Sequence, residues 1–336
     1  MRYVIGIDIG GTNIVVGAVQ EDGSGLGAVL SQPTRSEEGP DRVLDRLGAM
    51  AKTVIEETLS KQPGAEVIGI GIGAPGPLDT STGVVFLTPN LAWVNLPLRQ
   101  RMADALGYPA TLDNDANCAI LGEWWQGAAR GTRHALGVTI GTGIGGGVIA
   151  NGVLYHGASD CAGEFGHTTL DLQGRKCNCG NYGCLEAYAS GPAIALRAVE
   201  AIEAGAPSTM LEHAGGDATR ITAEIVYQAA QIGDEVALEV VRDTARYLGT
   251  GIANFVNIFN PEVVVVCGGV TRAGERLFGP LRQEVARRAF KPAVAACRIV
   301  AGELPGTAGV YGAAASFLQL RDESKVGLPT QGTVRA

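Results

Sequence analysis

A short element made of a strand, a glycine turn and a second strand occurs twice in this chain. The first copy covers residues 3–19 around the turn at 8–13, and the second covers 135–150 around the turn at 141–147. Glycine turns let backbone amides approach a ligand closely, and apolar runs on both sides are typical of buried strands. We interpret the repeat as two related α/β lobes that face a cleft, although glycine hairpins are common enough to resemble one another by chance.

The remaining pattern of apolar residues extends both lobes. A third strand at residues 27–32, a helix at 40–59 and a strand at 67–72 are expected in the first half. In the second half a long helical pattern with apolar positions from Val236 to Phe259 precedes a buried strand at 263–267. We expect a smaller α/β domain at 1–118 plus about 300–321, a larger one at 119–299, and a frayed polar tail at 322–336.

Composition excludes several classes of protein. A chain of 336 residues that is 46% hydrophobic can build two cores and is not disordered. Its net charge of −8 argues against nucleic acid or an anionic membrane as partner. The apolar start is too short for a signal peptide and is interrupted by Asp8, and the uncharged stretch at 135–155 holds seven glycines. We therefore expect a soluble, cytoplasmic protein.

Three glycine turns are candidate cradles for phosphate or nucleotide. In the first turn Asp8 can hold Mg²⁺ through water, and Thr12 adds a hydroxyl donor. The third turn follows the strand at 263–267, where open α/β sheets bind ligands, and is assigned to the adenosine side. The alternative for each is an ordinary turn without a ligand. The candidate nucleotide-binding residues are Asp8, Gly10, Gly11, Thr12, Asn13, Gly141, Thr142, Gly143, Gly268 and Gly269.

The run Asp113-Asn114-Asp115 stands between a short strand and an amphipathic helix. Asp115 is expected near the N-terminus of that helix, where the helix dipole stabilises a carboxylate. A capping role explains one aspartate but not the crowding of three polar side chains. Asp115 is therefore the candidate general base, which accepts the proton of a substrate hydroxyl during phosphoryl transfer.

Three clustered cysteines and a histidine predict a metal site. Cys177, Cys179 and Cys184 with His167 supply four ligands, the closed set of a structural Zn²⁺ site. A redox dithiol fits less well, because no pair is spaced C-x-x-C. Such a site would stiffen Glu164 and Glu186, whose carboxylates can bind sugar hydroxyls; helix N-terminal charge is the alternative role for Glu186. The four other cysteines are expected in the core, at Cys118, Cys161, Cys267 and Cys297.

Together these residues resemble the ROK family of repressors and sugar kinases, over nearly the whole chain. The most specific part is the run C-x-C-G-x-x-G-C-x-E at residues 177–186, although Asn178 stands where glycine is frequent in the family. The resemblance implies an actin-like, hexokinase-like fold of duplicated ribonuclease-H-like lobes. Within the family the chain is most similar to bacterial glucokinases, which implies ATP-dependent phosphorylation of glucose at its 6-hydroxyl.

The resemblance also implies roles for individual residues. Asp115 matches the catalytic base, and His167, Cys177, Cys179 and Cys184 match the zinc ligands. ATP with Mg²⁺ is the expected donor, and a homodimer or homotetramer is the expected assembly. The residues that match sugar-binding positions are Gly76, Asn90, Asn114, Asp115, Glu164, His167 and Glu186.

Three alternatives stay open at this stage. A kinase for N-acetylmannosamine, N-acetylglucosamine or fructose differs only in pocket shape, which no motif reports. A sugar-responsive repressor is disfavoured, since the first strand begins at Tyr3 and leaves no room for a helix-turn-helix module. An actin-like ATPase chaperone or filament protein is disfavoured, because that group lacks the cysteine cluster.

Overall fold

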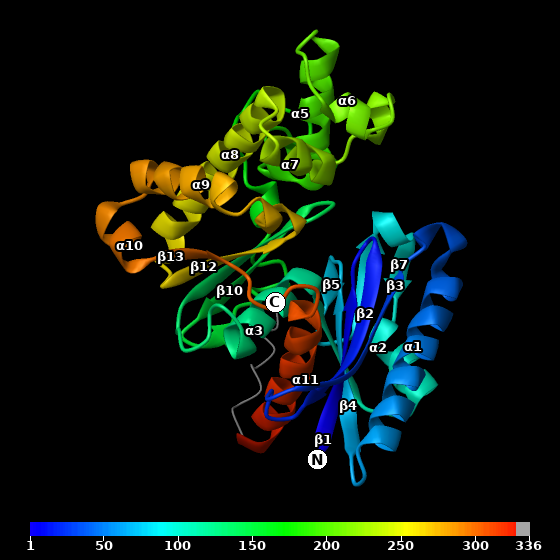
Figure 1. Ribbon diagram of the computed structural model, residues 1–336. Helices are drawn as coiled ribbons and strands as arrows, with labels where there is room; N and C mark the ends of the chain where they lie inside the picture. The colour runs from blue at the N-terminus through cyan, green and yellow to red at the C-terminus, as the bar shows by residue number, and fades with distance from the viewer. Residues whose placement is uncertain (327–336) are drawn as a thin grey trace. The chain divides into compact units, whose positions relative to one another are not determined.

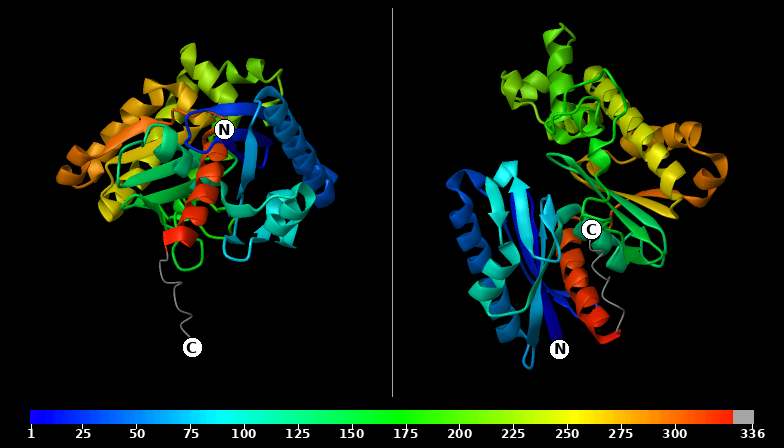
Figure 2. Two further views of the ribbon diagram at one scale, coloured as in Figure 1. Left: turned by 90° about the horizontal axis from the view of Figure 1, so that it is seen from below. Right: turned by 180° about the vertical axis from the view of Figure 1, so that it is seen from behind.

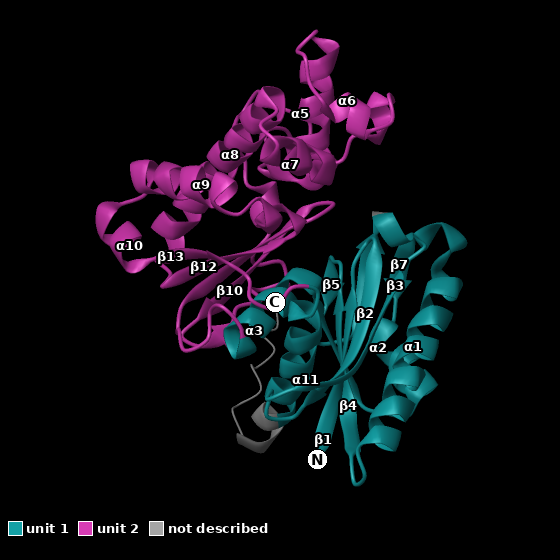
Figure 3. Cartoon of the chain, viewed as in Figure 1, with its two compact units in different colours: residues 1–126, 306–336 teal, residues 127–305 magenta. Residues whose placement is uncertain are grey.

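The computed structural model describes residues 1–326, apart from the side chains of Pro89 and residues 322–326. The chain forms two compact units, one of Met1–Gln126 with the segment from Gly306 onward, and one of Gly127–Pro305 (Figure 3). The sequence placed the first break after residue 118 and the second near 300. The observed break comes later because α3 (Asp115–Gln126) packs along α11 (Ala308–Val326) and belongs with it.

The contact between α3 and α11 depends on small residues. A methyl group added to Gly312 would lie 1.6 Å from the carbonyl oxygen of Cys118, and one added to Gly122 would lie 2.0 Å from that of Ala308. The two helix backbones therefore approach within a distance that no larger residue permits. This close packing holds α3 in unit 1.

Unit 1 is built on a five-stranded sheet in which three antiparallel strands are extended by two strands parallel to the third (Figure 1). In spatial order the strands are β3 (Leu26–Pro33), β2 (Asn13–Gln20), β1 (Arg2–Ile9), β4 (Glu66–Ala74) and β8 (Ala110–Asn114). The buried side chains of β1, including Ile5 and Ile7, form a core with α1 (Pro40–Lys61). Since the carboxyl ends of β1, β4 and β8 meet at one sheet edge, residues just after them are neighbours.

A small antiparallel sheet completes unit 1. It contains β5 (Leu78–Asp79), β6 (Val84–Thr88) and β7 (Trp93–Leu96), and the 3₁₀ turn η2 (Pro89–Leu91) joins the last two. The helix α2 (Leu98–Leu106) follows, and another 3₁₀ turn, η1 (Ser36–Glu38), precedes α1.

Unit 2 repeats the sheet of unit 1. Its strands, in spatial order, are β11 (Val153–Leu154), β10 (Ile144–Ala150), β9 (Ala135–Ile140), β12 (Val263–Gly268) and β13 (Arg298–Ala301). The first three are antiparallel and the last three parallel, as in unit 1. The shared order and directions confirm the duplicated α/β lobes predicted from the repeat.

The second glycine turn is shorter than predicted. Strand β10 begins at Ile144, so the glycines at 145–147 lie in the strand and not in the turn. The reason is tertiary: a methyl group on Gly146 would lie 2.4 Å from the ring of Phe165, which belongs to the 3₁₀ turn η3 (Phe165–His167). Here glycine makes room for a neighbouring ring.

Helices cover the sheet of unit 2, as the two further views in Figure 2 show. The longest, α8 (Glu235–Phe259), buries the predicted stripe from Val236 to Phe255, whereas Phe259 is 38% exposed. The other helical segments are α4 (Glu186–Ala189), α5 (Gly191–Glu203), α6 (Met210–His213), η4 (Ala218–Arg220), α7 (Ala223–Gln231), η5 (Gly269–Ala273), α9 (Glu275–Arg288) and α10 (Lys291–Ala296).

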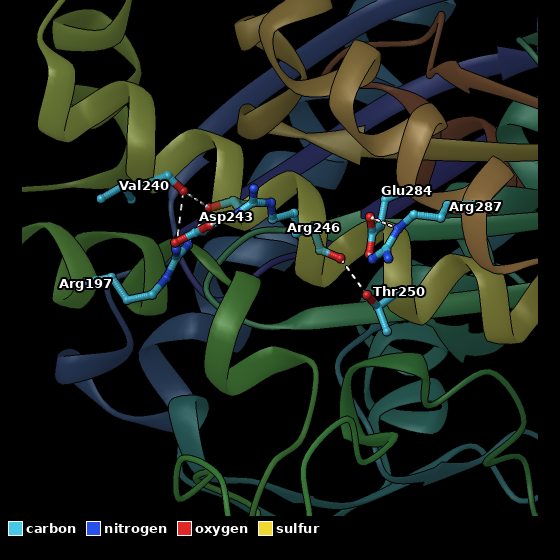
Figure 4. Close-up of polar contacts among 8 residues, drawn as sticks. Arg197, Val240, Asp243, Arg246, Thr250, Glu284 and Arg287 are labelled. Carbon is cyan, nitrogen blue, oxygen red and sulfur yellow. Dashed lines mark hydrogen bonds and ion pairs between the residues drawn. The ribbon is translucent and has the colours of Figure 1, made fainter.

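Polar contacts connect α8 to α5 and also form within α8 and α9 (Figure 4). Arg197 of α5 donates to the carbonyl of Val240 at 3.3 Å and also bonds the hydroxyl of Thr244. On α9 the carboxylate of Glu284 accepts from Arg287 at 2.7 Å, and this pairing lowers the pKa of Glu284 to about 2. The contacts of Arg197 thus tie α5 to α8, whereas the pair of Glu284 and Arg287 lies within α9.

Two further expectations need correction. Among the four scattered cysteines only Cys118 is fully buried, whereas Cys161 is exposed and the other two are half-buried, so the core assignment was wrong for Cys161. Helix α11 continues to Val326, well into the predicted polar tail, of which residues 327–336 lie outside the described part of the chain. None of the described helices is long and apolar enough to cross a membrane.

Candidate active site and metal site

The first glycine turn is braced by Thr34, a residue that no sequence motif singled out. The amide of Gly10 donates to the carbonyl of Asn13 at 2.9 Å, which closes the turn. The buried Thr34 then holds both sides: its hydroxyl donates to the carbonyl of Gly10 at 2.7 Å, and its amide to that of Thr12 at 2.8 Å. The turn therefore has a fixed shape, with Gly11, Thr12 and Asn13 exposed.

Asp8 and Asp115 form a pair of neighbouring carboxylates in unit 1. Burial raises the pKa of Asp8 to about 7, and the charge of Asp115 contributes to this rise. The carboxyl of Asp8 also lies against the first turn of α11, since a methyl group on Gly309 would be 2.3 Å from it. The hard carboxylate oxygens of Asp8 suit a Mg²⁺ ion, which would offset the repulsion between Asp8 and Asp115.

The three polar residues at the end of β8 and the start of α3 have separate roles. Asn114 caps α3, because its Oδ1 accepts from the amides of Ala116 at 2.9 Å and Asn117 at 3.2 Å. Asp113 is 2% exposed and accepts hydrogen bonds inside unit 1. Asp115 is the first residue of α3 and half-buried, so it combines partial solvent access with a place at the helix N-terminus. These properties suit a general base.

The other predicted sugar residues of unit 1 lie in two places. Gly76 is beside Asn114, since a methyl group on Gly76 would lie 3.4 Å from Nδ2 of Asn114. Asn90 lies in η2, between β6 and β7, and is exposed. The structure thus brings Gly76, Asn114 and Asp115 together at the end of β8 and places Asn90 on a separate turn.

In unit 2 the second glycine turn contacts Glu186. The amide of Ile144 donates to Oε2 of Glu186 at 2.9 Å. A methyl group on Gly143 would lie 2.6 Å from the same oxygen, so only glycine leaves room for this carboxylate. The carbonyl of Gly141 accepts from the amide of Gly191 at 2.9 Å, which ties the turn to the start of α5. Glu186 and the turn therefore hold each other in place.

The predicted metal ligands converge. One ligand atom each of His167, Cys177, Cys179 and Cys184 lies within 4.8 Å of the others. The sulfurs of Cys179 and Cys184 are 3.7 Å apart, and Sγ of Cys177 is 3.8 Å from Nδ1 of His167. Two sulfurs about 2.3 Å from a zinc ion at the tetrahedral angle lie about 3.8 Å apart. The donor set and its spacing therefore fit Zn²⁺.

This cluster is connected to Glu186 but less directly to Glu164. Sγ of Cys177 lies 3.6 Å from Oε1 of Glu186, which follows Cys184 by two residues. Burial raises the pKa of the Cys177 thiol to about 12, an effect that a coordinated cation opposes. Glu164 is exposed and precedes η3, where its carbonyl accepts from the amide of His167 at 3.1 Å. The cluster can thus position one carboxylate by contact and the other through the backbone.

A cavity of about 400 Å³ lies beside the third glycine turn of unit 2. Because β9 and β12 are parallel neighbours, the turns that follow them meet at the same sheet edge. Helix α7 forms the opposite wall, a contribution that its ordinary amphipathic sequence did not reveal. Residues around the cavity include Gly141, Gly191, Tyr227, Gln228, Gly269 and Arg272. Its size and its glycine edge suit a nucleoside.

The duplicated sheets, the braced turns and the clustered cysteines define a two-lobed protein of the actin-like, hexokinase-like fold. The family model described as "ROK family" matches residues 4–320. The chain belongs to the ROK family.

The relatives include kinases and regulators. A glucokinase from Thermotoga maritima is 40% identical over 312 residues, with 93% of this chain and 96% of the relative covered. A crystal structure of a ROK family glucokinase from Streptomyces griseus, in complex with glucose and AMPPNP, matches with a TM-score of 0.81 and 33% identity, over 94% and 98% of the two chains. A xylose repressor from Caldicellulosiruptor bescii is 33% identical, over 94% of this chain but 78% of its own.

Proposed function

We propose that this protein is an ATP-dependent hexose kinase that converts glucose to glucose 6-phosphate. The observation that carries the proposal is the position of Asp115 beside Asp8, next to a braced phosphate-type turn. Asp8 pairs with Gly73 of β4, and a methyl group on Gly73 would lie 3.6 Å from Cα of Asp115. A base next to a candidate Mg²⁺ carboxylate is the arrangement that phosphoryl transfer needs. The glucokinase relatives support the choice of glucose.

In this proposal each group has one task. Asp115 accepts the proton of the 6-hydroxyl, and Asn114 with the backbone at Gly76 orients the sugar. The turns at Gly10 and Gly141 bind the phosphates of ATP through backbone amides, and the cavity beside Gly269 holds its nucleoside. Asp8 would hold Mg²⁺, whose positive charge would offset the negative charge of the phosphates.

We also propose that the cluster of His167 and three cysteines binds Zn²⁺ with a structural role. Four protein ligands leave no open position for substrate, so the ion acts by fixing the chain around it. The 3.6 Å contact between Cys177 and Glu186 supports a role in orienting that carboxylate toward sugar hydroxyls. Glu164 and Asn90 complete the proposed set of sugar ligands.

The test is a panel of hexoses and N-acetylhexosamines with ATP and Mg²⁺, compared by kcat/KM. Glucose is expected to give the highest value. A higher value for N-acetylmannosamine, N-acetylglucosamine or fructose would replace the sugar but keep the reaction. If no sugar is phosphorylated while xylose or glucose still binds in calorimetry, the protein is a sugar-binding regulator, as its repressor relatives are named.

A second measurement tests the coupling of sugar and nucleotide. If sugar binding completes the site, ATP hydrolysis without sugar is much slower than glucose phosphorylation. Equal rates in the two assays would contradict this part of the proposal.

A further inference from the structure

Strand β8 passes into helix α3 with no residue between them. The strand ends at Asn114 and the helix begins at Asp115. The directions of both side chains therefore depend on where this corner of the backbone sits. A shift of about 1 Å at such a corner is enough to lower a reaction rate about 100-fold.

The corner is attached to α11 by a buried carboxylate. Oδ1 of Asp113 accepts from the amide of Asn114 at 2.8 Å and from Nδ2 of Asn117 at 3.2 Å, while Oδ2 accepts from the hydroxyl of Ser316 at 3.2 Å. Asp113 and Ser316 are 2% and 5% exposed. Because a buried charge is costly unless it is hydrogen-bonded, the carboxylate holds these donors to one geometry.

The same helix contacts the site at two more points. Gly309 lies against the carboxyl of Asp8, and Gly312 lies against the carbonyl of Cys118 in α3. Neither position has space for a side chain, so α11 fits closely against both carboxylate-bearing elements. Of these contacts, the one between Ser316 and Asp113 is made by side chains and reaches the corner itself.

We propose that Ser316 and Asp113 are positioning residues for the reaction. Through their hydrogen bond, α11 fixes the orientation of Asn114 and Asp115 toward the sugar. This inference rests on the proposed kinase function for its catalytic readout. Neither residue is assigned contact with substrate; both act through the corner that they hold.

The first test is the Ser316→Ala variant. Loss of the hydroxyl removes one donor from Oδ2 of Asp113, and we expect kcat for glucose to fall about 10-fold because Asp115 is displaced. The KM for ATP should stay within about twofold, since the groups proposed to bind the nucleotide are not attached to this corner. An unchanged kcat would overturn the proposal.

The matched control is Thr58→Val. Thr58 has a buried hydroxyl in the same unit that donates to the carbonyl of Val54 within α1 at 2.7 Å. This variant should lose a similar amount of thermal stability but keep its kcat. If both variants lose kcat in proportion to their loss of Tm, Ser316 is merely structural and the proposal is wrong.

A double-mutant cycle tests whether the two residues act as a pair. Asp113→Asn is expected to lower kcat more than Ser316→Ala, and adding Ser316→Ala to it should then change little. Additive effects on kcat would show that the two residues act separately, which would contradict the proposal.

A readout without turnover separates this inference from the proposed function. The amides of Ala116 and Asn117 donate to the cap Asn114, so a loosened corner should speed their hydrogen exchange in Ser316→Ala. If the wild-type protein phosphorylates no hexose, the kinase proposal fails, yet faster exchange would still support positioning of the corner by Ser316. Unchanged exchange would overturn the positioning role.

Discussion

The two sheets have the same strand order, but the polar groups beside their glycine turns are held in different ways. In unit 1, Asp113 bonds Ser316, which is 203 residues away in sequence. In unit 2, Glu186 bonds Ile144 at a separation of 42 residues and contacts Cys177 at a separation of nine. Unit 1 thus supports its site through a helix that is distant in sequence. Unit 2 supports its site through a nearby cluster of candidate metal ligands.

The comparison indicates which kind of change each unit is sensitive to. A helix that returns from the far end of the chain orients groups only if its packing stays intact. A cluster of four ligand side chains within 18 residues orients its neighbours by itself once a metal binds. We therefore expect unit 1 to respond to changes in packing and unit 2 to removal of metal.

The largest expected effect comes from Asp115 itself. Asp115→Asn keeps the shape of the side chain but removes the base, so kcat for glucose should fall about 1,000-fold, within the range for general-base catalysis. Glucose binding, measured by calorimetry, should persist. A variant that keeps a tenth of the wild-type kcat would show that Asp115 is not the base. The hydrogen bond between Ser316 and Asp113 would then have no catalytic base to position.

The next effect concerns the packing of α11. Gly312→Ala places a methyl group 1.6 Å from the carbonyl oxygen of Cys118, so the free energy of unfolding should fall by about 3 kcal/mol. Gly48→Ala is the matched control in α1, where nothing lies within 4 Å, and it should raise stability by about 0.5–1 kcal/mol. Urea unfolding measures both. Equal effects of the two substitutions would contradict the close packing of α11.

Metal removal tests the role of the cluster of His167 and three cysteines in unit 2. Cys179→Ser should lower the bound zinc content and raise the KM for glucose about 10-fold, because Glu186 loses its fixed neighbour. Cys161→Ser is the control, since Cys161 is also exposed but lies outside the cluster. Zinc is measured by mass spectrometry on the purified protein. Unchanged zinc content together with an unchanged KM for glucose would refute a structural metal at this place.

The smallest effect is a pH dependence that differs between the units. The pKa of Asp8 is raised from 3.8 to about 7, so in this interval the folded protein binds more protons than the unfolded chain. The free energy of unfolding should therefore fall as pH rises from about 4 to about 7 without Mg²⁺, and Asp8→Asn should flatten this slope. Thermal unfolding at several pH values measures it.

Glu284 of unit 2 gives the opposite sign. Arg287 and Arg288 hold its pKa at about 2, below the ordinary 4.5, so its stabilising contribution is present above about pH 4.5 and is lost as pH falls toward 2. Glu284→Gln should remove that acid-side loss. An identical pH profile for Asp8→Asn and Glu284→Gln would show that the two carboxylates do not differ as described.

Part of this architecture could be predicted from local patterns. Apolar runs and glycines located the paired strands, and Asn114 with Asp115 marked the start of α3. The extent of the second turn could not be predicted, because Gly146 leaves space for the ring of Phe165, which comes later in the chain. No sequence signal marks the roles of Thr34, Ser316 or the α7 wall of the cavity. An isolated hydroxyl or an amphipathic helix is common, and its role shows only when its neighbours in the fold are known.

By itself, the sequence determined the repeated α/β element, the candidate base and the candidate metal ligands. Each of these depends on residue types close together in the chain, where strand period, helix capping and ligand spacing act directly. Only the tertiary structure decided that α11 returns to unit 1 to brace Asp8 and Asp113, and that Glu186 bonds the turn at Ile144. Those contacts join distant segments, and packing of the whole chain selects them.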